Sequence, residues 1–267
     1  MQYQEYERLE YTDAVPVILK YTTKLSQDLD YIHWHESIEI LYFQMGNGVV
    51  YSDNEKIYAY PEDIVVINSS NIHKVCSVTR SSQYYCMLID KSFCEAFGFS
   101  FENFRFAAKI CNESLTGHIK EIVRNYGRED EDSRLAVKIE LLSLILEMKK
   151  RYALPGKSMA DTGKTATIKE SIRFIRKNFT EHITLDDVAA HAGLNKYYLS
   201  HAFREVTDTT VVHFINTLRC NYAVQLMNSG DYSIAEISEA CGFDNPSYFT
   251  KVFKKYKGIL PSKAKEG

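Results

Sequence analysis

The chain has 267 residues, of which 45% are hydrophobic and 25% charged, and its formal net charge is -3. This length is too great for one ordinary core and fits two domains with a connector. The sequence has no run of about 18 apolar residues, and its start, MQYQEYERLE, lacks the apolar core of a secretory signal. We therefore expect a soluble, cytoplasmic protein with no membrane partner. Six cysteines without a CxxC pair predict free thiols.

The first part of the chain has the pattern of an all-β domain. Between Val15 and about Asp90, β-branched and aromatic stretches alternate with the turn signals GNG, SDNE and NSSN. The predicted strands are VPVILKY, SIEILYFQ, VVYS, KIYAY, DIVVIN, HKVCSV and YYCMLI. Closely spaced short strands of this kind predict an antiparallel barrel or jelly roll, which we assign to residues 1–112.

Two helices are predicted next, within residues 113–152. The second, Ser133 to Arg151, has two apolar stripes, Leu135, Ile139, Leu142 and Leu146 on one and Val137, Leu141, Leu144 and Met148 on the other. A helix with two apolar stripes must cover two surfaces. One would be the barrel, and the other is either the same helix of a second subunit or further core of this chain. We predict a dimerisation segment here, followed by a linker over residues 153–165.

Residues 166–267 contain one supersecondary unit twice. LDDVAAHAGLNKYYLSHAFRE, from Leu185, is repeated as IAEISEACGFDNPSYFTKVFKK, from Ile234. Each copy predicts a helix that ends at a glycine with a left-handed backbone, Gly193 or Gly242, and then a second helix. In the second copy Asn245 can cap that helix and Pro246 can occupy its first turn.

The second helix of each copy has an apolar face and a polar face. The apolar faces are Leu199, Ala202, Phe203 and Val206 in the first copy and Phe249, Val252, Phe253 and Tyr256 in the second. Two such helices could read successive major grooves of double-stranded DNA, about 10 base pairs apart. Solvated helical hairpins without a DNA role are the alternative. The predicted DNA-binding residues are Tyr197, Ser200, His201, Arg204, Asn245, Ser247, Tyr248, Thr250, Lys251, Lys254 and Lys255.

The stretch SIAEISEACGFDNPSYFTKVFKKYKGILPS, residues 233–262, resembles the signature of the AraC/XylS family of bacterial transcription regulators. The resemblance extends back to about Thr167 and implies a DNA-binding domain of seven helices with two helix-turn-helix units. Two residues depart from the family pattern. His201 stands where an arginine is common, and Asp208 replaces the usual glycine after the first reading helix, although aspartate tolerates a left-handed backbone better than most residues.

A second motif lies in YIHWHESIEILYFQMG, residues 31–46. His33, His35 and Glu39 match the first motif of cupins, HxH(x)3E(x)6G, and His73 is near the histidine of the second motif. Such ligands suit zinc, iron, manganese or nickel. However, PEDIVVINSSNIH lacks the glycine and close histidine of metal-binding cupins, and the resemblance to AraC-type regulators implies a barrel that binds a small effector, often a sugar, without metal. A buried histidine with only a structural role is a third possibility, above all for His73.

We therefore predict a DNA-binding transcription regulator with a cupin-like effector domain, not an enzyme, with no cofactor or metal. The expected partners are double-stranded DNA, a small-molecule effector such as a sugar, a second copy of the chain and RNA polymerase. A metal-dependent cupin enzyme fused to a DNA-binding module is the alternative from another class, and a barrel that serves dimerisation alone is the third. The predicted effector-binding residues are His33, Trp34, His35, Glu39, Tyr42 and His73.

Overall fold

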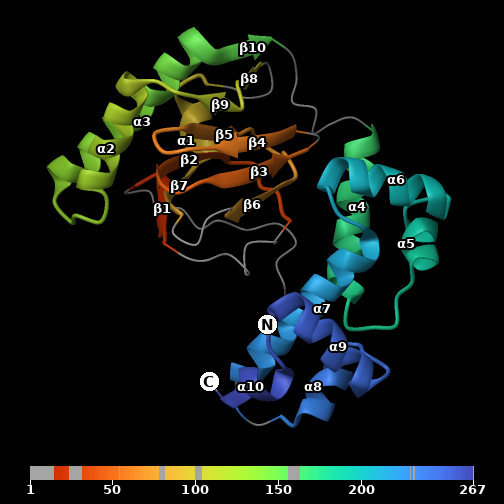
Figure 1. Ribbon diagram of the computed structural model, residues 1–267. Helices are drawn as coiled ribbons and strands as arrows, with labels where there is room; N and C mark the ends of the chain where they lie inside the picture. The colour runs from red at the N-terminus through yellow and green to blue at the C-terminus, as the bar shows by residue number, and fades with distance from the viewer. Residues whose placement is uncertain are drawn as a thin grey trace. The chain divides into compact units, whose positions relative to one another are not determined.

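The structure is a computed structural model that describes residues 15–23, 32–53, 55–77, 82–99, 104–155, 163–228, 230 and 232–266 (Figure 1). The chain divides into two compact units, with the boundary between residues 162 and 163.

Two antiparallel sheets form most of the N-terminal unit (Figure 1). The larger has the order β1 (Val17–Thr22), β7 (Gln83–Ile89), β2 (Ile38–Met45), β5 (Ile64–Ile67) and β9 (Lys109–Ile110). The smaller has the order β4 (Glu55–Ala59), β3 (Gly48–Ser52) and β6 (His73–Ser77). All seven predicted strands are present, and the predicted sheet-rich N-terminal domain is confirmed. Three further elements were not predicted from the sequence: β9, α1 (Lys91–Ala96) and β8 (Phe104–Phe106).

Strand β2 is buried on both faces, which explains its continuous apolar sequence. Successive side chains of a strand point to opposite faces. Ile40 and Tyr42 belong to the core between the larger sheet and the helices that follow it. Leu41 and Phe43 belong to a second core, made by residues of both sheets. Glu39 is on the Leu41 face, so its carboxylate lies on the side of the smaller sheet.

Helices α2 (Glu113–Asn125) and α3 (Glu131–Tyr152) cover the outer face of the larger sheet (Figure 1). Asn112 and Asp130 cap their first turns with side-chain oxygens. Of the two apolar stripes of α3, the Val137, Leu141, Leu144 and Met148 stripe is buried in this core. The other stripe is largely exposed, with Leu135, Ile139 and Leu146 all more than 40% accessible.

The predicted linker, residues 153–165, is too long at both ends. Ala153–Pro155 form β10, which pairs antiparallel with β8. At the other end, α4 begins at Gly163, so Thr165 lies in its first turn. Residues 156–162 lie outside the described part of the chain.

The described residues of the C-terminal unit form the seven helices that the family resemblance implied. Around the repeats these are α4 (Gly163–Asn178), α7 (Val211–Asn228) and α10 (Pro261–Glu266). The first repeat is α5 (Leu185–His191) with α6 (Lys196–Thr207), and the second is α8 (Ile234–Ala240) with α9 (Pro246–Lys257). The equal lengths of matching helices confirm the duplication. No helix in the described ranges is long and apolar enough to cross a membrane.

The two repeats also share their local structure. A capping box opens the first helix of each, with Thr184 and Asp187 in one and Ser233 and Glu236 in the other. An asparagine caps each second helix. As predicted, Gly193 and Gly242 have positive φ, of 65° and 77°, and Asn245 and Pro246 begin α9. Asp208 ends α6 with φ 52°, as Gly258 ends α9 with φ 76°, so aspartate adopts the left-handed backbone at this position.

The two turn glycines differ in their surroundings, and this difference predicts a difference in stability. A Cβ at Gly193 would meet nothing within 4 Å, whereas a Cβ at Gly242 would lie 2.5 Å from the carbonyl oxygen of Thr180. Gly193→Ala should therefore cost only the left-handed backbone, about 1–2 kcal/mol. Gly242→Ala adds an overpacking cost of about 1–3 kcal/mol. Urea unfolding followed by circular dichroism would measure both, and equal losses of stability would contradict this account.

Candidate functional site

Helices α6 and α9 present the predicted DNA-binding residues on their outer faces. Leu199, Phe203, Phe249 and Phe253 are fully buried, which fixes the opposite face of each helix outward. The side chains that are exposed as predicted are Tyr197, Ser200, His201, Arg204, Ser247, Tyr248, Lys251, Lys254 and Lys255.

Two of the predicted DNA-binding residues have partners within their own helix. The side-chain oxygen of Asn245 accepts from the backbone N–H groups of Ser247 and Tyr248, at 2.8 and 3.2 Å, so it acts as a helix cap. Thr250 is half-buried, and its hydroxyl donates to the carbonyl oxygen of Pro246 at 2.9 Å. The side-chain oxygen of Asn245 and the hydroxyl proton of Thr250 are thus engaged in hydrogen bonds to the helix backbone and not free for DNA.

Positive charge on the outer faces is concentrated on α9. Its sequence, PSYFTKVFKKYK, has four lysines and no acidic residue. Within the described residues, Lys251, Lys254 and Lys255 form no ion pair. On α6, in contrast, Lys196 lies 3.2 Å from Asp186, and His201 lies 3.6 Å from Glu205, which also contacts Lys164. Phosphate groups of DNA would therefore be attracted mainly to the second repeat.

In the N-terminal unit, the structure brings four of the six predicted effector residues into one group. The imidazole nitrogens of His33, His35 and His73 and a carboxylate oxygen of Glu39 all lie within 4.8 Å of one another. His73 begins β6 and forms an antiparallel bridge with His33, with backbone N–H to O distances of 3.1 and 2.9 Å. Glu39 comes from β2, so the group joins both sheets. His35, Glu39 and His73 are buried and His33 is half-buried.

Charge interactions within this group alter two pKa values. Burial alone would raise the pKa of Glu39, but the charge of His73, a hydrogen bond from His35 and the close approach of the His73 ring hold this pKa well below its usual value. Burial would lower the pKa of His73, but its interactions with the Glu39 carboxylate outweigh this and raise it. Glu39 is therefore ionised, and it favours positive charge on whatever lies next to it.

Tyr42 and Trp34 are not part of the four-residue group. Tyr42 leaves the other face of β2 from Glu39, and its hydroxyl donates to the Glu62 carboxylate at 2.9 Å, on the side of α2 and α3. Trp34 is buried, at 3% accessible. Tyr42 lies outside the group because it is three residues from Glu39, and residues three apart on a strand point to opposite faces.

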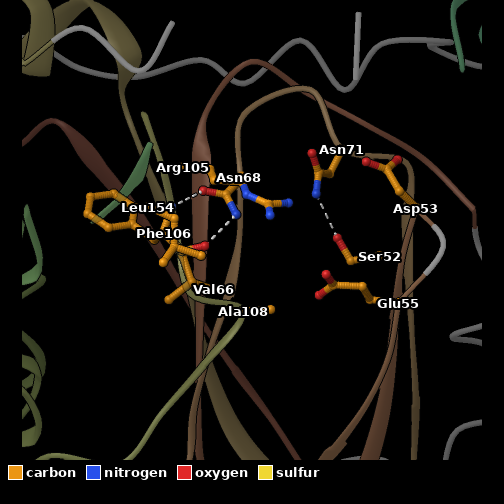
Figure 2. A pocket seen from close by; sticks show the side chains of 10 residues that line it. All are labelled: Ser52, Asp53, Glu55, Val66, Asn68, Asn71, Arg105, Phe106, Ala108 and Leu154. Atoms are coloured by element: carbon orange, nitrogen blue, oxygen red, sulfur yellow. Dashed lines mark hydrogen bonds between the residues drawn. The ribbon is translucent and has the colours of Figure 1, made fainter. Parts of the chain in front are cut away.

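The N-terminal unit also contains a cavity of about 320 Å³, and Figure 2 shows polar side chains on its opposite walls. Asn68 is held on one wall by two hydrogen bonds to the backbone of Phe106, of 3.1 and 2.7 Å. Asn71, on the other wall, donates to Ser52 at 3.0 Å. The cavity is lined by Ser52, Asp53, Glu55, Val66, Asn68, Asn71, Arg105, Phe106, Ala108 and Leu154.

None of the predicted effector residues is among the ten described residues that line this cavity. From the sequence, NSSN at residues 68–71 was predicted only as a turn, and residues 104–106 were not predicted as a strand. Four polar residues close to strand ends, Ser52, Asp53, Asn68 and Asn71, were the available signal. Their meeting at one place depends on the pairing of β3 with β6 and of β2 with β5, which sequence spacing alone does not determine.

Family comparisons match both units. The AraC-like ligand binding domain matches residues 25–145, and a helix-turn-helix domain matches residues 188–267. The melibiose operon regulatory protein of Escherichia coli is 24% identical, over 97% of this chain and 88% of the relative. The regulator YdeC of Bacillus subtilis is 21% identical, over 90% and 89%. Among solved structures, ToxT from Vibrio cholerae is 17% identical, with 94% and 97% covered and a TM-score of 0.49. The two family matches, on a sheet-rich unit and a duplicated helix-turn-helix unit, show that the chain belongs to the AraC family of transcription regulators.

Proposed function

We propose that this regulator binds a specific DNA sequence through α6 and α9 and that a small molecule bound in its N-terminal unit controls this binding. The observation that carries the proposal is the duplicated helix-turn-helix unit, whose two second helices have fixed inner faces and exposed polar outer faces. The N-terminal residues of a reading helix contact base edges, and cations nearby contact phosphates. The two helices are proposed to read two sites about one helical turn apart.

The proposed effector is a sugar or a related metabolite, bound in the cavity beside β5. The lining supports this class because amide, hydroxyl, carboxylate and guanidinium groups can together hydrogen-bond several hydroxyl groups of one ligand. Phe106 adds an aromatic surface. One relative of nearly equal length is the melibiose operon regulatory protein. The cavity volume, about 320 Å³, is at the small end of the range for ligand sites.

Thermal unfolding across a panel of sugars and other metabolites tests the effector proposal. A ligand present at about 100 times its dissociation constant adds about 2.7 kcal/mol to stability, enough for a clear rise in melting temperature. We expect at least one sugar to raise it and to alter DNA affinity at the same concentration. If no metabolite shifts the melting temperature or DNA binding, the N-terminal unit is a dimerisation module only and the effector proposal is wrong.

The proposed dimer contact is the exposed stripe of α3, Leu135, Ile139, Leu142 and Leu146. Three of these apolar side chains are more than 40% accessible in the chain by itself, which a second copy of the same helix would reduce. RNA polymerase is the further partner proposed for the DNA-bound regulator. A dimer would place four reading helices on one operator.

Replacing Ile139 by glutamate should weaken this dimer. The change places a charge in the middle of the apolar stripe, and we expect the dissociation constant to rise at least 10-fold. Met45→Glu is the matched control, because Ile139 and Met45 are both 51% accessible but Met45 lies on β2. Sedimentation velocity over a range of concentrations would measure both variants. An unchanged dimer in Ile139→Glu would remove α3 from the interface.

A further inference from the structure

The four-residue group of His33, His35, Glu39 and His73 has the composition and spacing of a metal site. Its ligand atoms come from three parts of the chain, the segment before β2, β2 itself and the start of β6, and lie within 4.8 Å of one another. His35 Nε2 and His73 Nε2 are 3.1 and 2.9 Å from the same carboxylate oxygen, Glu39 Oε2. Ligands bound to one ion at about 2.1 Å are about 3–3.4 Å apart, so these separations need little adjustment.

Backbone carbonyl groups orient two of the rings. His35 Nδ1 lies 3.0 Å from the carbonyl oxygen of Ser37, and His73 Nδ1 lies 2.9 Å from that of Asn71. Since a carbonyl oxygen only accepts, each Nδ1 carries the proton and donates it. His35 Nε2 faces the acceptor Glu39 Oε2 at 3.1 Å and donates to it, and His73 Nε2 lies 2.9 Å from the same oxygen. A bound metal ion would displace the protons on Nε2 and take the lone pairs that point toward Glu39. Ring orientation by a hydrogen bond from the other nitrogen is the usual support of a metal-binding histidine.

The carboxylate of Glu39 is oriented in the same way. Its Oε1 accepts a hydrogen bond from the Cys86 thiol, at 3.1 Å, which leaves Oε2 to face the two rings. The Nε2 atom of His73 is buried and, among the described residues, makes no aligned hydrogen bond, although Oε2 is only 2.9 Å away. A proton on Nε2 would thus be poorly aligned with Oε2, whereas a cation next to both atoms would satisfy them together.

We propose that His33, His35, Glu39 and His73 bind one divalent first-row transition-metal ion. Three imidazoles and one carboxylate favour zinc, iron, nickel or manganese over calcium and magnesium, which prefer oxygen ligands alone. This metal site goes beyond the proposed effector function, and the metal proposal does not depend on the effector proposal. The ion would bridge the two sheets, because Glu39 belongs to the larger sheet and His73 to the smaller.

The site is connected to the cavity through Asn71. Its carbonyl oxygen accepts from His73, and its side-chain amide donates to Ser52 on the cavity wall. Ser52 and His73 are also register partners on β3 and β6, with side chains on the same face of the sheet. An ion that holds the His73 ring in place would therefore also hold Asn71 and Ser52, which line one wall of the cavity.

Metal content of the full chain tests the proposal directly. Protein without an affinity tag would be stripped with a chelator and dialysed against zinc chloride, with zinc per chain measured by mass spectrometry. Glu39→Gln keeps the shape of the side chain, and His73→Asn removes one imidazole. His118→Gln is the matched control, since His118 Nδ1 lies 2.6 Å from Glu140 outside the group. Circular dichroism and binding to random DNA would show that each variant is folded.

We expect about one zinc ion per chain in the wild type and in His118→Gln, and at least 100-fold weaker binding in the other two variants. X-ray absorption of the zinc-loaded wild type provides a readout that needs no variant. It should show about three imidazole ligands at about 2.0–2.1 Å. Less than a tenth of an ion per chain in the wild type, absorption without imidazole ligands, or binding unaffected by Glu39→Gln would each overturn the proposal. A wild-type protein that binds no zinc but still selects its DNA sequence would overturn the metal site and leave the proposed function intact.

Discussion

Lys251→Ala is expected to reduce the preference of the regulator for its selected DNA site over random DNA by about 5- to 150-fold. Lys251 lies one turn into α9, is exposed, and has no ion pair among the described residues. Its ammonium group is free to donate to a guanine edge in the major groove, and a good base contact is worth about 1–3 kcal/mol of discrimination. Affinities for a selected site and for a scrambled site of the same length, at one salt concentration, would measure the loss.

Lys255→Ala is the matched control for this experiment, because it removes the same charge from the same helix. Lys255 lies one turn further from the N-terminus of α9, where reading helices meet phosphates instead of bases. We expect it to weaken binding to both DNA molecules equally and to reduce the salt dependence of log K by about 0.9. Equal losses on specific and scrambled DNA for Lys251→Ala would exclude Lys251 from base reading.

Arg105→Met is expected to weaken effector binding by about 10- to 100-fold and to leave DNA affinity in the absence of effector unchanged. Arg105 is a half-buried cation among the residues that line the cavity, and Figure 2 shows its guanidinium group between the two walls. Hydrogen bonds from a charged donor contribute about 1.5–3 kcal/mol, and methionine keeps much of the side-chain volume. Isothermal titration with the sugar that raises the melting temperature would measure the change.

Arg128→Met is the control, since Arg128 is exposed in the connection between α2 and α3 and does not line the cavity. It should bind the effector as the wild type does. If Arg105→Met also binds the effector with wild-type affinity, the effector occupies another part of the N-terminal unit.

Most of the fold could be predicted from the sequence because its signals are local. The seven main strands follow from short β-branched stretches between turn residues, and the helix repeat follows from a regular apolar period with matching glycines. β8, β9 and β10 have two or three residues each, too few to show a period. β8 pairs with β10, and β9 pairs with β5, in each case with a partner far away in the sequence, so tertiary structure determines these strands.

The candidate sites also divide into those that local sequence predicts and those that depend on tertiary structure. The outer faces of α6 and α9 could be assigned because burial of Leu199 and Phe249 determines the rest of each helix surface. The cupin-like motif singled out His33, His35 and Glu39, with His73 as the candidate second-motif histidine, and the structure places these four residues in one group. The cavity could not be predicted, because its walls come from strands that are adjacent only after the sheets have paired.

Selection of bound sequences from a random pool of DNA tests the central claim most directly. The full-length protein would be incubated with the pool, with and without the metabolite that stabilises it, and the bound DNA sequenced. We expect an enriched motif with two blocks about 10 base pairs apart, whose enrichment changes with the metabolite and is reduced in Lys251→Ala. Bound DNA with no enriched motif, in either condition, would contradict a sequence-specific regulator that reads DNA through α6 and α9.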